Sequence, residues 1–114
     1  MEQKYLENIL DAIHYQIVFV DLTHTIRFLN KQAKYEYCQV RGHKNLIGKS
    51  LFEYHNPKSK EHILAAVERF KNHGGEEFLS VSSNNLRIYM TPVRDEQGEL
   101  IGYFERYEAN FTKS

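Results

Sequence analysis

The sequence predicts an α+β fold: one five-stranded antiparallel sheet with helices on one face. Five segments are rich in β-branched and aromatic residues or alternate apolar with polar positions, as strands with one buried face do. One longer segment, residues 57–72, repeats its apolar residues at helical spacing. Consecutive strands can be joined by hairpins except strands two and three, which a helical crossover connects. This order gathers the helices in one layer.

The N-terminal part should contain a helix, a hairpin and a second, short helix. Residues 4–13 are predicted to form an amphipathic helix. Its apolar stripe consists of Leu6, Ile9, Leu10 and Ile13. Residues 16–21 and 25–30 read as two strands joined by a tight connection. Asn30 then supplies the cap of a short helix over residues 31–37.

The stretch from Phe52 to Phe70 is the feature around which the prediction is organised. Residues 39–50 before it are polar and loop-like. Asn56 suits the cap of a helix, and Pro57 suits its first turn, where a missing N–H costs nothing. The apolar face of this helix consists of Ile63, Leu64, Val67 and Phe70. We expect it to cover the sheet.

The last part of the chain contains three predicted strands. These are residues 77–82, 86–93 and 100–109. Turns are expected at 83–85 and at 94–99, which contains Gly98. No internal repeat or linker interrupts the pattern, so we predict a single domain over 1–114. Within it, 1–14 is the N-terminal helix and 15–110 is the core of sheet and helices.

Composition narrows the classes of function. Lys plus Arg equals Asp plus Glu at 15 each, so the charge balance indicates neither a nucleic-acid partner nor an anionic membrane surface. The longest apolar run, around Ile17 to Val20, is far shorter than the ~20 residues that span a bilayer. The N-terminus lacks the apolar segment of a signal peptide. We therefore expect a cytoplasmic location, no nucleic acid and no membrane.

The chain contains, in this order, VFVDLTHTIRFLNKQA (18–33), LIGKSLFEYHNPKS (46–59) and RIYMTPVRDEQGELIGYFE (87–105). Together these three stretches resemble the PAS domain family. The first is similar to its opening hairpin, which ends in an Asn that starts a helix. The second is similar to its Ile-Gly-Lys segment before the ligand-facing helix. The third is similar to its closing Asp-x-x-Gly hairpin. The His-x-Pro-x-Ser run at 55–59 resembles a subset of bacterial PAS domains.

The resemblance implies a sensor or protein-interaction module, often dimeric, with a pocket between sheet and helices. The first hypothesis is a cytoplasmic sensory module that binds a small molecule and signals to a partner protein. Its ligand would be haem b or an aromatic or acidic metabolite. The alternative is a ligand-free homodimerisation or docking module that uses the apolar stripe of the N-terminal helix. We do not predict an enzyme, because the sequence has no nucleophile–base motif and no phosphate loop.

We expect a mostly apolar pocket that is lined in part by the strands at 86–93 and 100–107. The candidate ligand-binding residues surround the central helix and extend onto the fourth strand. They are Phe52, Tyr54, His55, His62, Val67, Phe70, Arg87 and Tyr89. For haem, the resemblance implies an iron ligand on the long helix, so His55 or His62 would serve. The other four histidines, His14, His24, His43 and His73, are expected to face solvent.

Two further ligand classes depend on single residues. Flavin-binding light sensors of this family need a reactive Cys between Asn and Arg, whereas Cys38 stands in YEYCQVRG, so we do not expect flavin. Arg87 and Tyr89 share one strand face, and Arg87 could hold an acidic ligand if that face is the inner one. Ile88 and Met90 favour the opposite face as the inner one, which would place Arg87 in solvent.

Overall fold

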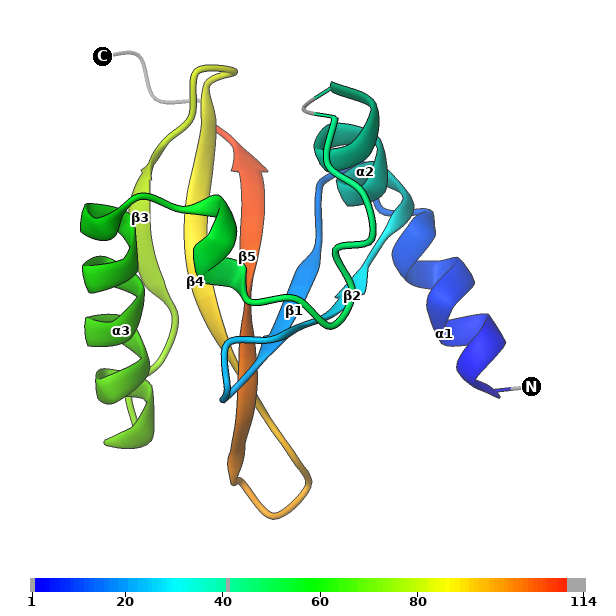
Figure 1. Ribbon diagram of the computed structural model, residues 1–114. Coiled ribbons are helices and arrows are strands. Elements are labelled where there is room, and N and C mark those ends of the chain that lie inside the picture. Colours follow the sequence, from blue (N-terminus) through cyan, green and yellow to red (C-terminus); the bar gives the residue numbers. More distant parts are fainter. Residues whose placement is uncertain (1, 41, 111–114) are drawn as a thin grey trace.

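The computed structural model describes residues 2–40 and 42–110, so residues 1, 41 and 111–114 of the predicted domain lie outside the described chain. Its centre is a five-stranded antiparallel sheet in the order β2-β1-β5-β4-β3. The long helix α3 (Pro57–Lys71) and the short turn η2 (Leu51–Tyr54) cover one face of the sheet (Figure 1). The predicted α+β architecture is confirmed.

The N-terminal elements follow the predicted order with small shifts. Helix α1 spans Glu2–Asp11, two residues earlier than expected. Strands β1 (Val18–Asp21) and β2 (Ile26–Leu29) form the opening hairpin. Helix α2 (Lys31–Lys34) continues as a π-helical segment, η1 (Tyr35–Val40). The short helix therefore extends into a region that the sequence predicts as loop.

Asn30 is buried, and both the oxygen and the nitrogen of its side-chain amide form hydrogen bonds. Its Oδ1 accepts hydrogen bonds from the N–H groups of Ala33, at 3.0 Å, and Ile17, at 2.9 Å. Its Nδ2 donates to the carbonyls of Leu10 and Tyr15, each at 2.9 Å. An amide offers two donors and one carbonyl oxygen. Asn30 is thus the predicted cap of α2 and also the joint between the core and the end of α1.

Helix α3 begins and ends as predicted. Asn56 accepts a hydrogen bond from the Ser59 N–H at 2.8 Å, and Pro57 occupies the first turn. The Gly74 N–H bonds the Arg69 carbonyl at 2.8 Å, and a Cβ at position 74 would lie 2.5 Å from that oxygen. Only glycine fits this end without a shift of the backbone. The helix buries Ile63, Ala66, Val67 and Phe70 against the sheet.

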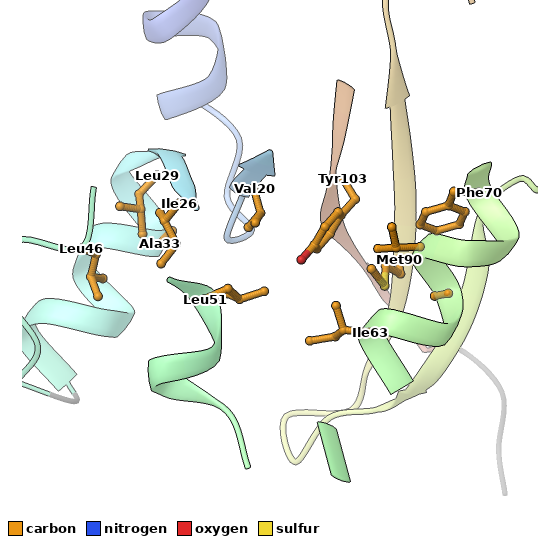
Figure 2. Close-up of a cluster of buried hydrophobic side chains, with 12 residues drawn as sticks. Val20, Ile26, Leu29, Ala33, Leu46, Leu51, Ile63, Phe70, Met90 and Tyr103 are labelled. Atoms are coloured by element: carbon orange, nitrogen blue, oxygen red, sulfur yellow. The ribbon is translucent and has the colours of Figure 1, made fainter. Parts of the chain in front are cut away.

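The closing strands are β3 (Glu77–Val81), β4 (Leu86–Arg94) and β5 (Leu100–Ala109). Met90 of β4 is buried beneath α3, which defines the inner face of the sheet (Figure 2). Because alternate residues of a strand point to opposite sides, Arg87 and Tyr89 lie on the outer face. The alternation alone left this choice open, and burial of Met90 decides it.

The hydrophobic core joins helices α2 and α3 to the sheet (Figure 2). Its buried members are Val20, Ile26, Leu29, Ala33, Leu46, Leu51, Ile63, Ala66, Val67, Phe70, Met90 and Tyr103. None of the helices described for this chain has the length and apolar character needed to cross a membrane.

Candidate functional site

A cavity of about 20 Å³ lies between the inner face of the sheet and the helical layer. Its lining residues come from three strands, from η1, η2 and α3, and from the segments beside them. They are Gln16, Val18, Val20, Tyr37, Leu51, His55, Ile63, Met90, Tyr103, Phe104, Glu105 and Tyr107. Figure 2 shows Val20, Leu51, Ile63 and Tyr103 directed toward this interior region.

The lining combines buried apolar side chains with half-exposed residues, most of which are polar. Val20, Leu51, Ile63 and Met90 are buried. The half-exposed lining residues are Gln16, Val18, Tyr37, His55, Phe104, Glu105 and Tyr107. Pockets with an apolar body and a few polar groups bind and orient small molecules.

His55 follows η2 and is fixed by a hydrogen bond to that turn. Its Nδ1–H donates to the Leu51 carbonyl, with 3.0 Å between the two atoms. A carbonyl can only accept, so Nδ1 carries the proton. In the neutral ring, Nε2 is then the acceptor nitrogen. His55 therefore contributes a hydrogen-bond acceptor to the lining.

Tyr103 lines the cavity and belongs to an aromatic cluster in which His24 contacts both Tyr103 and Phe52. A hydrogen bond of 2.8 Å joins its hydroxyl to Nδ1 of His24, and the His24 ring lies 4.7 Å from the Phe52 ring. Burial raises the pKa of the Tyr103 phenol, and the charges of Glu105 and Asp21 raise it further. The phenol therefore stays protonated.

His24 differs from the solvent-facing position expected for it. It is half-buried, and partial burial followed by the charge of Lys71 lowers its pKa. His43 is also half-buried, with its ring 4.8 Å from that of Tyr54. Both histidines reach aromatic partners that are distant in sequence, so local turn patterns did not reveal these contacts.

Glu105 is the one charged residue among the twelve described residues of the lining. It pairs with Met90 across β4 and β5, which places it on the inner face. The Tyr107 hydroxyl donates to its Oε2 at 2.9 Å. The sequence prediction placed part of residues 100–107 beside the pocket but did not name Tyr103, Glu105 or Tyr107 as ligand-binding residues. The alternation of β5 does place Tyr103 and Glu105 on one face, and this was the signal that could have identified them.

Of the predicted ligand-binding residues, His55 lines the cavity. Phe52 and Tyr54 pack against the core but lie outside the lining. Val67 and Phe70 are buried where α3 meets the sheet, so they fill the core instead of facing open space. His62 is exposed on α3. The helical spacing located the covered face of α3, but most of that face packs directly on side chains.

Arg87 and Tyr89 belong to a polar and aromatic network on the outer face. Arg87 Nε donates to the Tyr89 hydroxyl at 2.8 Å, and its guanidinium lies over the Phe78 ring. Arg106 lies over the Tyr89 ring and forms an ion pair with Glu108. Neither Arg87 nor Tyr89 reaches the cavity lining, so the inner-face hypothesis for these two residues is wrong.

Haem does not fit the site as it stands. Pockets for cofactors and similar ligands occupy about 300–1,000 Å³, whereas this cavity holds about 20 Å³. His55 has the donated Nδ1–H that an iron-bound histidine commonly has, but His62 points to solvent. Among residues 2–40 and 42–110, no cluster of three His, Cys, Asp or Glu side chains is arranged to hold a metal ion. Cys38 is a half-buried free thiol.

An antiparallel sheet covered on one face by helices, with a small cavity between the two layers, defines an α+β domain. The sequence matches the PAS domain family over residues 6–108. The chain belongs to this family, as its three sequence stretches indicated. No curated protein matches the sequence.

Solved structures share this fold at low sequence identity. The C-terminal domain of a Streptococcus mutans protein has a TM-score of 0.75 and 18% identity, over 96% of this chain and 85% of that one. The PAS domain of a Colwellia psychrerythraea protein has a TM-score of 0.67 and 19% identity, covering 96% and 97%. A sensory box sensor histidine kinase from Vibrio cholerae has a TM-score of 0.60 and 14% identity, covering 94% and 87%.

Proposed function

We propose that this PAS domain is a cytoplasmic sensory module, without catalytic activity, that binds a small molecule and transmits a change of shape to a partner protein. The cavity carries the proposal, because its lining joins β1, β4 and β5 to η1, η2 and α3. A molecule in the cavity would contact the sheet and the helical layer together. Occupancy would therefore change how the two layers pack. Similarity to a sensor histidine kinase supports a signalling context.

A native mass spectrum of the purified domain, with variants that fill the cavity, tests this function. Ile63→Trp places a large ring in the lining, whereas Leu64→Trp is its neighbour on α3, with 38% of its surface exposed. We expect wild type and Leu64→Trp to carry an additional small mass that Ile63→Trp lacks. A bare polypeptide mass for the wild type, purified gently from cells, would contradict the proposal.

A second function, homodimerisation through α1, is favoured by a different observation. Tyr5, Leu6 and Ile9 of α1 are 62%, 60% and 60% exposed, and every residue of this helix is exposed or half-buried. Isolated helices shorter than ~12–15 residues are marginal in water, so α1 needs a partner surface. We infer that a second copy supplies it.

Light scattering tests the dimer. Leu6→Glu/Ile9→Glu should convert it to a monomer. The control Gln3→Glu/Asn8→Glu adds the same charge at exposed polar positions of the same helix and should leave the mass unchanged. A dimer that survives Leu6→Glu/Ile9→Glu would remove α1 from the interface.

A further inference from the structure

We propose that the cavity selects small amines, with the ammonium group beside Glu105 and the apolar end among Val20, Ile63 and Met90. The inference rests on the proposed ligand-binding function of the same cavity and adds the chemical class of the ligand. It also replaces the acidic metabolite that a ligand-binding Arg87 would have required.

The charge of the lining is the first step. Glu105 is a carboxylate, and the other eleven described lining residues are uncharged or histidine. The two arginines nearest to Glu105 on β4 and β5, Arg87 and Arg106, lie on the outer face of the sheet. There Arg87 forms an ion pair with Glu108, and Arg106 forms one with Glu76. An anion would meet Glu105 without a cation to compensate, whereas an ammonium group would be attracted to it.

A hydrogen bond positions the Glu105 carboxylate, and its charge acts on a neighbouring residue of the cavity lining. Tyr107 donates to one carboxylate oxygen, and an ionised carboxylate has about four acceptor positions in all. The Glu105 charge contributes to the raised pKa of the buried Tyr103 phenol, after the larger effect of burial. The Glu105 charge therefore acts on a second residue of the same lining.

The remaining polar groups suit a donor ligand. His55 offers Nε2 as an acceptor, because its Nδ1–H is committed to the Leu51 carbonyl. Tyr37 and Tyr107 add aromatic rings to the lining, and ring faces attract cations. An ammonium group carries several donors and no acceptor. An ammonium ligand can therefore donate to the acceptors of this lining, whereas a carboxylate ligand can only accept hydrogen bonds.

Size limits the ligand. A volume of about 20 Å³ accommodates roughly one water molecule. A bound amine must therefore be short, and the lining must widen around it. Tyr37 and Tyr107 belong to the half-exposed part of this lining. The buried apolar residues of the lining then contact the short apolar chain of the amine.

Three probes of matched length and different charge test the proposal: n-propylamine, n-propanol and propionate. At pH 7 the amine is cationic and propionate anionic. Each probe is titrated into the ¹⁵N-labelled domain, and its dissociation constant is obtained from the NMR chemical-shift changes of the lining residues. A hydrogen bond to a charged group is stronger than one between neutral groups. We expect propylamine to bind roughly tenfold or more tightly than propanol, and propionate to bind most weakly.

Two variants on one strand complete the test. Glu105→Gln should remove the advantage of propylamine over propanol while propanol still binds, which also shows that the cavity is intact. Glu108→Gln, on the outer face of β5, should keep the wild-type preference. Equal affinities for all three probes in the wild type would overturn the amine inference and leave the proposed sensory function standing. Binding of no probe, together with a bare native mass, would overturn both.

Discussion

Helices α1 and α3 have the same kind of sequence pattern and different positions in the molecule. Each repeats apolar residues at helical spacing. Helix α3 buries four residues, including Phe70, which is fully buried. In α1 every residue is exposed or half-buried, and the helix lies beside α2, away from α3 (Figure 1). An apolar stripe therefore indicates that a face is to be covered, and does not indicate what covers it.

The largest expected effect compares truncation of one residue in each helix. Phe70→Ala removes a fully buried ring, and such substitutions cost about 3–5 kcal/mol of unfolding free energy. Leu6→Ala removes a side chain that is 60% exposed, so it should change the monomer's stability by less than about 0.5 kcal/mol. Urea denaturation at low protein concentration measures both. Similar losses for the two variants would show that α1 packs on its own chain.

The second prediction concerns the joint between α1 and the core. Asn30→Ala leaves two N–H groups and two carbonyls without their side-chain partner in a buried place. Each unsatisfied group costs about 1–3 kcal/mol, partly relieved by water at the half-exposed ones. We expect a total loss of about 2–4 kcal/mol. Hydrogen exchange should speed up at the amides of Ile17 and Ala33 before it does in α3.

Asn56→Ala is the matched control, because Asn56 caps α3 and is exposed. Loss of such a cap costs about 1 kcal/mol. If Asn30→Ala costs no more than Asn56→Ala, then Asn30 acts as a helix cap alone. Its four hydrogen bonds would not hold the end of α1 to the core.

Local sequence patterns predicted the helices and strands well but predicted the cavity lining poorly, because the two depend on different contacts. The caps at Asn30 and Asn56 and the closing strands depend on neighbours within a few residues, and the structure confirms them. The cavity depends on packing between strands and helices far apart in the chain. Phe70 was expected to line it but fills the core, because α3 lies directly on the sheet there.

The sequence did not reveal which face of the sheet is the inner one, and this face determines which residues line the cavity. Once Met90 is placed inside, the strand register puts Glu105 and Tyr103 beside the cavity and Arg87 outside it. The sequence contains both alternations, but only burial distinguishes them. Fold and helix ends could therefore be predicted from sequence, while the chemistry of the cavity required three-dimensional contacts.

The smallest expected effect is a pH dependence in the region that follows α3. Arg106 bonds both oxygens of Glu76, Nη2 to Oε1 at 2.7 Å and Nε to Oε2 at 2.9 Å. These bonds lower the pKa of Glu76 from 4.5 to about 2, against the opposing effect of burial, and Thr91 adds a further hydrogen bond.

A carboxyl group whose pKa is lower in the folded protein stabilises the fold while it is ionised in both states. The contribution of Glu76 is therefore complete above about pH 4.5 and is lost as the pH falls toward 2. The pair is part-exposed, so solvent screens it and the effect should be below about 1 kcal/mol. Melting temperatures of wild type and Glu76→Gln should differ at pH 6 and converge near pH 2. A constant difference across this range would mean that Glu76 acts through packing or neutral hydrogen bonds and not through its charge.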